Sequence, residues 1–203
     1  MSARKDNTEE KILDAATTVF VRKGMDGARM QEIADEAGIN KALLHYYFRS
    51  KDKLFDAIFS KIIGFAFPKI GQILQSDMDF TSKVEQAIDT YIDLLLKYPY
   101  LPGFILKEIN RDPSVFFKLV MKHGFNIKPI LQIISDAMDR GEIVCMKPEH
   151  LVVNVIGLCV FPFAARPVIS FLAFNEDKAA TQAFLEERKQ EVKQFVLRAI
   201  EPK

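Results

Sequence analysis

The chain of 203 residues contains no tryptophan, only two cysteines and only three histidines. Cys145 and Cys159 are too few for a disulfide framework, and we interpret them as reduced thiols of a cytoplasmic protein. The histidines His45, His123 and His150 are scattered and form no metal-ligand cluster in the sequence. A glycine-rich phosphate loop and a nucleophile elbow are also missing. We therefore expect no catalytic residue, no metal, no cofactor and no enzymatic activity; a reproducible turnover would contradict this.

The chain also lacks a strong charge of either sign, because its formal net charge is +1. The first 60 residues hold ten Lys or Arg and ten Asp or Glu. Composition alone therefore gives no indication of a nucleic-acid partner. The exception is a short basic cluster, in which Lys41, Arg49, Lys51 and Lys53 are accompanied by a single acid, Asp52. If the protein binds DNA, this local basic cluster is the part of the sequence whose charge favours it.

A signal sequence is not apparent, since the N-terminal segment MSARKDNTEE is polar. This predicts a cytoplasmic protein. Residues 151–174 are apolar enough to raise the possibility of a membrane span, which needs about 20 residues. Arg166 and two prolines, Pro162 and Pro167, interrupt the segment. We therefore expect a core or subunit-interface helix followed by a bent connection, and no membrane partner. A carrier or membrane-associated module built on this segment is the alternative.

Apolar residues recur at helical spacing along nearly the whole chain, and no strand alternation is evident. A first helix is expected from Asn7 to Gly24, with shorter helices over residues 30–37 and 41–48. Ser50 should cap a fourth helix. In the remainder, the expected helix caps or boundaries are Ser82, Pro99, Pro102, Pro113, Pro148 and Asn175.

These patterns predict an all-α protein with two parts. An N-terminal three-helix domain with a helix-turn-helix would cover residues 1–62, and a larger helical domain for ligand binding and dimerisation would cover residues 63–203. The fourth helix would cross the boundary, so a motion in one part could be passed to the other.

Residues 30–48 have the features of a helix-turn-helix. Gly38 suits the left-handed backbone that a tight turn needs, and Ile39 can fill the corner between the two helices. Asn40 can cap the second helix. The inner face would consist of Ile33, Ala34, Ala37, Leu44 and Phe48. An amphipathic hairpin with a merely solvated polar face is the alternative interpretation.

The outer face of the second helix carries side chains suited to DNA. Lys41 can reach a phosphate or a guanine edge, and Leu43 can pack against a thymine methyl group. His45 can donate to or accept from a base edge. The hydroxyl of Tyr47 can reach a phosphate, and Lys51 lies at a helix N-terminus, which favours phosphate as well.

The segment GMDGARMQEIADEAGINKALLHYYFRSKDKLFDAIF resembles the DNA-binding domain of the TetR family of regulators, and ILDAATTVFVRKG resembles that family's first helix. The resemblance covers about residues 8–62. It implies a homodimer that binds a near-palindromic operator on double-stranded DNA, usually as a repressor. It also implies dimerisation through the last two long helices and a small-molecule effector bound by the C-terminal domain. The predicted DNA-contacting residues are Arg29, Met30, Asn40, Lys41, Ala42, Leu43, His45, Tyr46, Tyr47 and Lys51.

The sequence departs from the family pattern at three places. Ala28 and Arg29 replace the Thr or Ser that commonly caps the second helix, so that cap is expected to be lost. Ala42 and Leu43 stand where Gly and Thr are frequent, and His45 replaces a common Tyr. These differences leave the expectation of a DNA-binding protein unchanged. They mean that the base preference of other family members cannot be assumed for this chain.

A largely apolar effector pocket is expected where several helices of the second domain converge. Ordinary core is the alternative for each of its residues, and Lys107 and Glu108 could equally lie on a solvated face. The predicted ligand-binding residues are Tyr91, Ile92, Leu95, Phe104, Glu108, Phe117, Met121, Asn154, Leu158 and Phe161. The identity of the effector cannot be predicted from these residues.

Overall fold

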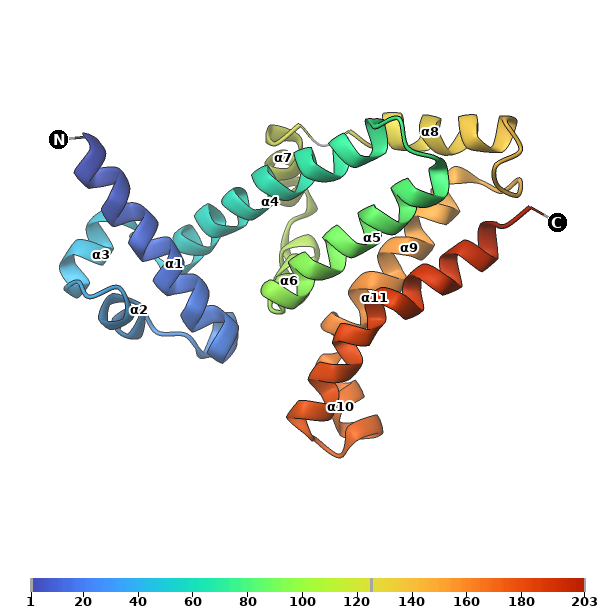
Figure 1. Cartoon of the computed structure of the whole chain (residues 1–203). Coiled ribbons are helices and arrows are strands. Elements are labelled where there is room, and N and C mark those ends of the chain that lie inside the picture. Colours follow the sequence, from blue (N-terminus) through green and yellow to red (C-terminus); the bar gives the residue numbers. More distant parts are fainter. Residues whose placement is uncertain (1, 125, 203) are drawn as a thin grey trace. The chain divides into compact units, whose positions relative to one another are not determined.

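The computed structural model describes the backbone of residues 2–124 and 126–202, and all of their side chains except those at positions 2–6, 25, 104, 108, 111, 115, 116 and 119. This part of the chain is helical without a strand, which confirms the predicted fold class (Figure 1). The chain divides into two compact units, Met1–Phe65 and Ala66–Lys203. The division lies three residues beyond the boundary expected from the sequence.

The helices follow one another without any other regular element in the described residues. Their bounds are α1 Ser2–Gly27, α2 Met30–Glu36, α3 Lys41–Tyr47, α4 Lys51–Gln75, α5 Phe80–Lys97, α6 Leu101–Arg111, α7 Pro113–Lys122, α8 Ile127–Asp139, α9 Pro148–Ala164, α10 Arg166–Phe174 and α11 Lys178–Ile200. The first unit holds α1 to α3 and the beginning of α4, and the second unit holds the remainder.

Helix α1 begins before the expected cap, so Asn7 does not start it. Its regular part ends at Gly24, where φ is 70° and ψ is 169°, as the sequence predicted. A positive φ of this kind is unfavourable for any residue with a Cβ, which explains why a glycine ends the helix there.

The core of the first unit is built from four helices. Phe20 of α1 and Phe55 of α4 are both fully buried, with ring centroids 5.7 Å apart. The side-chain hydroxyl of Ser50 accepts a hydrogen bond from the Lys53 amide at 3.2 Å, which confirms the cap of α4. The buried apolar residues of this unit are Ile12, Ala15, Ala16, Val19, Phe20, Ala28, Ile33, Ala34, Leu44, Phe48, Leu54, Phe55, Ile58, Phe59, Ile62 and Ile63.

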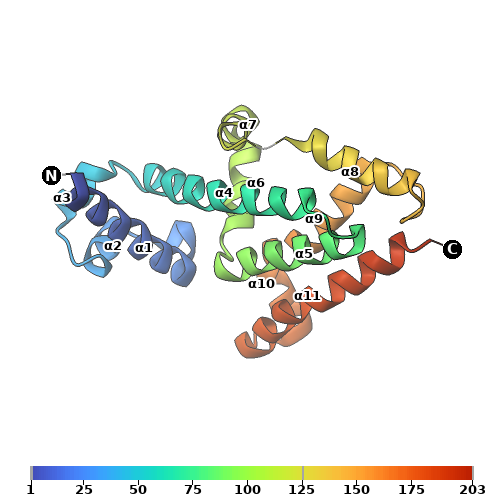
Figure 2. The same ribbon diagram turned by 45° about the horizontal axis from the view of Figure 1, so that its top comes forward.

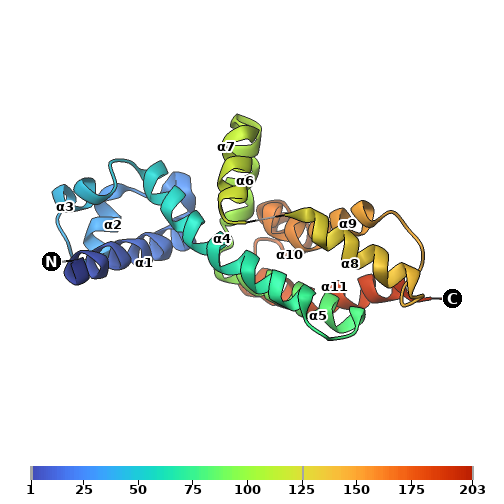
Figure 3. The same ribbon diagram turned by 90° about the horizontal axis from the view of Figure 1, so that it is seen from above.

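In the second unit, α5 and α11 lie side by side and both pack against α9 (Figures 1 and 2). Buried residues of these helices form one core with contributions from α8. Lys193 of α11 bonds to Asp89 of α5 at 3.0 Å, and Lys189 pairs with Asp93 one turn away. The α6–α7 hairpin stands out from the rest of this unit (Figure 3).

Two helix caps differ from the expectation. Helix α5 is capped by Asp79, whose carboxylate accepts from the Ser82 amide at 2.9 Å and from the Ser82 hydroxyl at 2.6 Å. These bonds lower the pKa of Asp79. Helix α11 is capped by Asp177 rather than Asn175. Asn175 instead ends α10 in the left-handed conformation, with φ at 48°, which Asn tolerates better than most residues.

The apolar segment of residues 151–174 forms two helices. Helices α9 and α10 meet at Ala165 with a bend of 72°, and Pro167 lies in the first turn of α10. Pro162 is accommodated inside α9. By length and composition alone, α4 is apolar enough to cross a membrane, and so are α9 and α10 if taken as one span. In α4 this composition has another explanation, since Leu54 and Phe55 are buried in the first unit.

The cap of α11 can be tested by substitution. Asp177 accepts from the amides of Ala179 at 2.8 Å and Ala180 at 3.1 Å, so D177A should lower the free energy of unfolding by about 1 kcal/mol. D177S retains a capping oxygen and should recover most of that loss. Urea denaturation measures both values; equal stability of D177A and the unchanged protein would contradict the assigned cap.

Candidate nucleic-acid interface

The turn between α2 and α3 has the geometry that the sequence predicted. Gly38 has a φ of 65°, and the Ile39 amide donates to the Ala34 carbonyl at 3.0 Å across the turn. The Asn40 carboxamide oxygen accepts from the Leu43 amide at 2.7 Å, which caps the start of α3. The glycine and the cap together fix where α3 begins and in which direction it runs.

Helix α3 is attached to the unit by one side. Leu44 is fully buried and Phe48, directly after the helix, is 7% exposed. Ile33 and Ala34 of α2, the helix that contacts α3, are also fully buried. Small Ala34 permits the close approach of the two helices. Ala37 and Ile39 are half-buried at the turn.

The opposite side of α3 is exposed. Tyr46 is 70% exposed and Leu43 is 36% exposed. Tyr47 is half-buried, and its ring meets that of Tyr46 edge to face at a centroid distance of 5.5 Å. The exposed residues of α3 and its cap are Asn40, Lys41, Ala42, Leu43, His45 and Tyr46. The structure thus brings the predicted contact residues of α3 onto one accessible face.

The start of α2 is secured without the usual side-chain cap. Arg29 occupies the cap position, and its amide donates to the Glu32 carboxylate at 3.3 Å. Glu32 also accepts from the Lys23 ammonium at 2.6 Å, which lowers the pKa of Glu32. The hydrogen bond between the Arg29 amide and the Glu32 carboxylate replaces part of the lost cap. It does not use the guanidinium of Arg29, and Arg29 is exposed. The spacing of Glu32, three residues after the cap position, is the sequence signal for this arrangement.

Lys51 is placed differently from the other predicted contacts. Its ammonium donates to the Asp26 carbonyl at 3.3 Å and to the Ala28 carbonyl at 3.2 Å. It therefore joins the start of α4 to the connection that precedes α2. Sequence reasoning missed this role, because the carbonyls lie 23 and 25 residues away in the chain.

The part of the chain that the structure describes contains no group of three or more His, Cys, Asp or Glu that could hold a metal ion. Cys159 is buried in the second unit, and burial raises the pKa of its thiol to about 12, so it is a poor nucleophile.

Comparison with known proteins identifies the class. A family model described as bacterial regulatory proteins, tetR family, matches residues 12–58. The HTH-type transcriptional repressor NicS of Pseudomonas putida is 40% identical over 190 residues, which cover 89% of this chain and 88% of that protein. The chain belongs to the TetR family. Another relative of this TetR-family protein is the HTH-type transcriptional regulator YttP of Bacillus subtilis, 25% identical over 85% of this chain and 84% of its own length.

Solved structures agree with the fold of this TetR-family protein. A TetR-family transcriptional regulator from Mesorhizobium loti has a TM-score of 0.62 at 21% identity and covers 98% of both chains. A regulator of the TetR/AcrR family from Thermobifida fusca has a TM-score of 0.66 at 16% identity and covers 92% of this chain and 97% of its own. The relatives are transcriptional regulators and not enzymes, as predicted.

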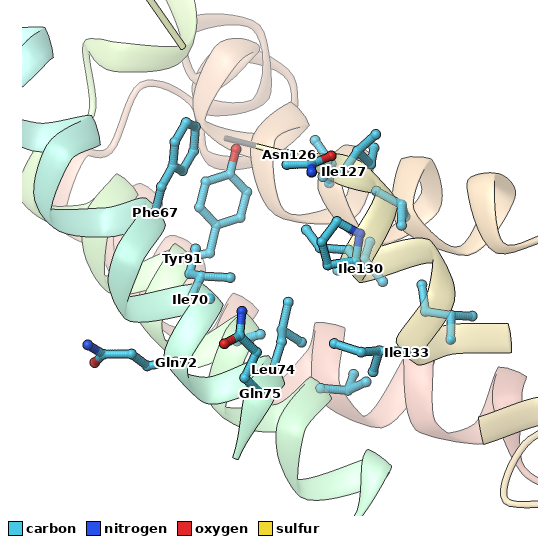
Figure 4. A pocket seen from close by; sticks show the side chains of 18 of the residues that line it. Phe67, Ile70, Gln72, Leu74, Gln75, Tyr91, Asn126, Ile127, Ile130 and Ile133 are labelled. Carbon is cyan, nitrogen blue, oxygen red and sulfur yellow. The ribbon is translucent and has the colours of Figure 1, made fainter. Parts of the chain in front are cut away.

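The second unit of this TetR-family protein contains a cavity of about 520 Å³. Residues of α4, α5, α8 and α9 surround it, and the connection between α7 and α8 contributes His123, Gly124 and Asn126. In Figure 4, Tyr91 and Gln75 lie on one side, and Ile127, Ile130 and Ile133 lie on the other. A volume of this size is typical of sites for small molecules, which range over about 300–1,000 Å³.

Among the predicted pocket residues whose side chains the structure describes, only Tyr91 lines this cavity. Ile92 and Leu95 are buried in the core, and Leu158 packs against that core. Asn154 is exposed. Phe117, Met121 and Phe161 are 60%, 65% and 65% exposed. The side chains of Phe104 and Glu108 lie outside the described residues. The predicted ligand-binding residues that do not line this cavity are Ile92, Leu95, Leu158, Asn154, Phe117, Met121 and Phe161.

A substitution of Lys51 separates a positioning role from a phosphate contact. K51A removes two hydrogen bonds from a charged donor, so the first unit should lose up to about 3 kcal/mol of stability. DNA affinity should fall by the same factor at every salt concentration. A lost phosphate contact would instead reduce the slope of log affinity against log salt by about 0.9.

Lys53 provides the matched control for this test, since its side chain is 74% exposed and pairs with the Asp56 carboxylate at 3.6 Å. K53A should leave the melting temperature nearly unchanged. A reduced salt slope for K51A together with an unchanged melting temperature would contradict the positioning role.

Proposed function

We propose that this TetR-family regulator is a ligand-responsive repressor that binds a palindromic operator as a homodimer and is released by a small, largely apolar molecule. The observation that carries the proposal is the exposed face of α3, on a helix capped by Asn40 and anchored by Leu44. A helix with one buried and one accessible side is suited to the major groove. We place the protein in the cytoplasm with no membrane partner.

In this proposal the residues of the interface have two tasks. Lys41, Leu43 and His45 read base edges, because they project from the first turns of α3. Arg29 and Tyr47 contact phosphate, and the amides at the start of α4 favour an anion there. Met30, Asn40, Ala42 and Tyr46 complete the contact surface. Phosphate contacts set the orientation of the protein and base contacts set its preference.

Dimerisation is proposed on the exposed apolar residues of α9, α10 and α11. Phe171 and Leu172 are 64% and 73% exposed, and Phe195 of the last helix is 63% exposed. Val153, Phe161 and Val168 extend the same kind of surface. Leu185 and Val192 of α11 do not contribute to this surface, because both side chains are fully buried in the core of the second unit.

Release by a ligand is proposed to act through α4. This helix begins in the DNA-binding unit, and its later residues Phe67, Pro68, Ile70 and Leu74 line the cavity. Pro68 lacks the amide that would bond to the residue-64 carbonyl, so α4 bends most easily there. Two recognition helices must fit major grooves about 34–36 Å apart. A ligand that binds better to another spacing lowers the DNA affinity by that difference in binding free energy.

DNA recognition can be tested with fragments from upstream of the gene in a mobility-shift titration. One fragment should bind with strong salt dependence. H45A should cost about 1–3 kcal/mol on that fragment and relax the preference at one base step, whereas K41A should weaken binding.

The control is K178A, which removes the same charge from an exposed position in the second unit. It should bind DNA like the unchanged protein. Equally weak binding of every fragment by the unchanged protein would refute the proposal of a specific operator.

The proposed dimer surface can be tested by sedimentation. F171E buries a charge if the surface is covered, so this variant should sediment as a monomer at micromolar concentration. M121E is the control, because Met121 of α7 is 65% exposed and lies outside the surface. A monomeric unchanged protein, or a dimeric F171E, would disprove this interface.

A further inference from the structure

The lining of the cavity contains no acidic or basic side chain apart from one imidazole among the described residues. We infer that the cavity binds an uncharged molecule with an apolar body and one hydrogen-bonding head group, and that the head group lies at the end formed by Tyr91, His123 and Asn126. This inference rests on the proposed ligand response and specifies which chemical class of ligand produces it.

The apolar body is matched by one wall of the cavity. Ile127, Ile130, Ile133 and Ile134 recur at helical spacing along α8 and all line the cavity. Ile127 is 39% exposed, so part of its side chain is accessible to a ligand. Val152, Val155 and Ile156 of α9 continue the same apolar surface.

The head group is matched by polar side chains that line the cavity. The Nε2 atom of His123 is buried and has no hydrogen-bond partner among the described residues. Tyr91 also lines the cavity, and burial raises the pKa of its hydroxyl, so the hydroxyl stays protonated and can donate to a ligand. Buried polar atoms normally have partners, and we infer that a ligand in the cavity supplies one for His123.

Tyr91 and Asn126 lie toward the same end of the cavity (Figure 4). The Asn126 oxygen accepts from the Lys128 amide at 3.1 Å, so its amide nitrogen remains for a ligand. A phenol, an imidazole and a carboxamide can each bond to a neutral head group. At the other end Gln72 points away from the cavity, as Figure 4 shows.

A charged head group is disfavoured by desolvation. A carboxylate entering this cavity would lose its water and meet no Lys or Arg among the described lining residues. A neutral amide of the same shape loses less hydration and retains its hydrogen bonds. Charge, rather than size, is therefore what the cavity selects against.

The test compares decanamide with decanoate, which share a chain and differ in charge. Binding to the full-length protein is measured by calorimetry and by the shift in melting temperature at pH 7.5. Decanamide should bind at least about tenfold more tightly than decanoate. Equal or tighter binding of decanoate would overturn the uncharged class, and so would the failure of both probes to bind.

Two tyrosine variants test where the head group lies. Y91F removes the hydroxyl at the cavity, and it should lower the affinity for decanamide by about two- to tenfold. Tyr98 is a half-buried tyrosine seven residues further along the chain, and it does not line the cavity. Y98F should therefore leave the affinity for decanamide unchanged. Equal affinities of Y91F and the unchanged protein would overturn the assigned head-group end.

The operator affinity of the same preparations separates this inference from the proposed function. Decanamide binding that leaves operator affinity unchanged would support the ligand class and contradict ligand-induced release. Operator binding that decanoate abolishes more effectively than decanamide would support release and overturn the uncharged class.

Discussion

A helix of seven residues is not stable by itself in water, so everything that α3 does depends on its attachment to α2. That attachment comes from the burial of Leu44 and Phe48 in the same core as Ile33 and Ala34 of α2. The Asn40 cap supplies a partner for one of the free amides of the first turn. Once these contacts hold one side, the other side must face outward. The accessible surface for DNA is thus a consequence of the core of the first unit.

Electrostatic contacts around this core are local and mostly exposed. Lys23 and Glu32 join α1 to α2, and Lys61 joins α4 to Glu10 of α1 at 3.3 Å. Exposed pairs of this kind contribute little to stability, so the apolar contacts set the fold. Lys51 is the exception, because its half-buried ammonium bonds to two backbone carbonyls. Within the basic cluster of the sequence, Lys51 is thus bonded to the protein itself, whereas Lys41 and Arg49 are exposed.

The second unit shows why a ligand site is harder to predict than a DNA-binding helix. Tyr91 and Ile92 are neighbours in α5, yet Tyr91 lines the cavity and Ile92 is fully buried in the core. Successive residues of a helix point about 100° apart. An apolar pattern on all sides of a helix does not tell which side meets a core and which meets a cavity. Ile127 and Ile130 were not predicted for the same reason.

The sequence by itself determined the helix-turn-helix, since Gly38, Asn40 and the apolar face of residues 30–48 act within a few residues of one another. It also determined the helical class and several helix boundaries, because prolines and caps act locally. Only the tertiary structure decided that the Lys51 ammonium bonds to the carbonyls of residues 26 and 28. It also decided which residues of four helices line the cavity. Such arrangements depend on the packing of helices distant in the chain, which no local pattern encodes.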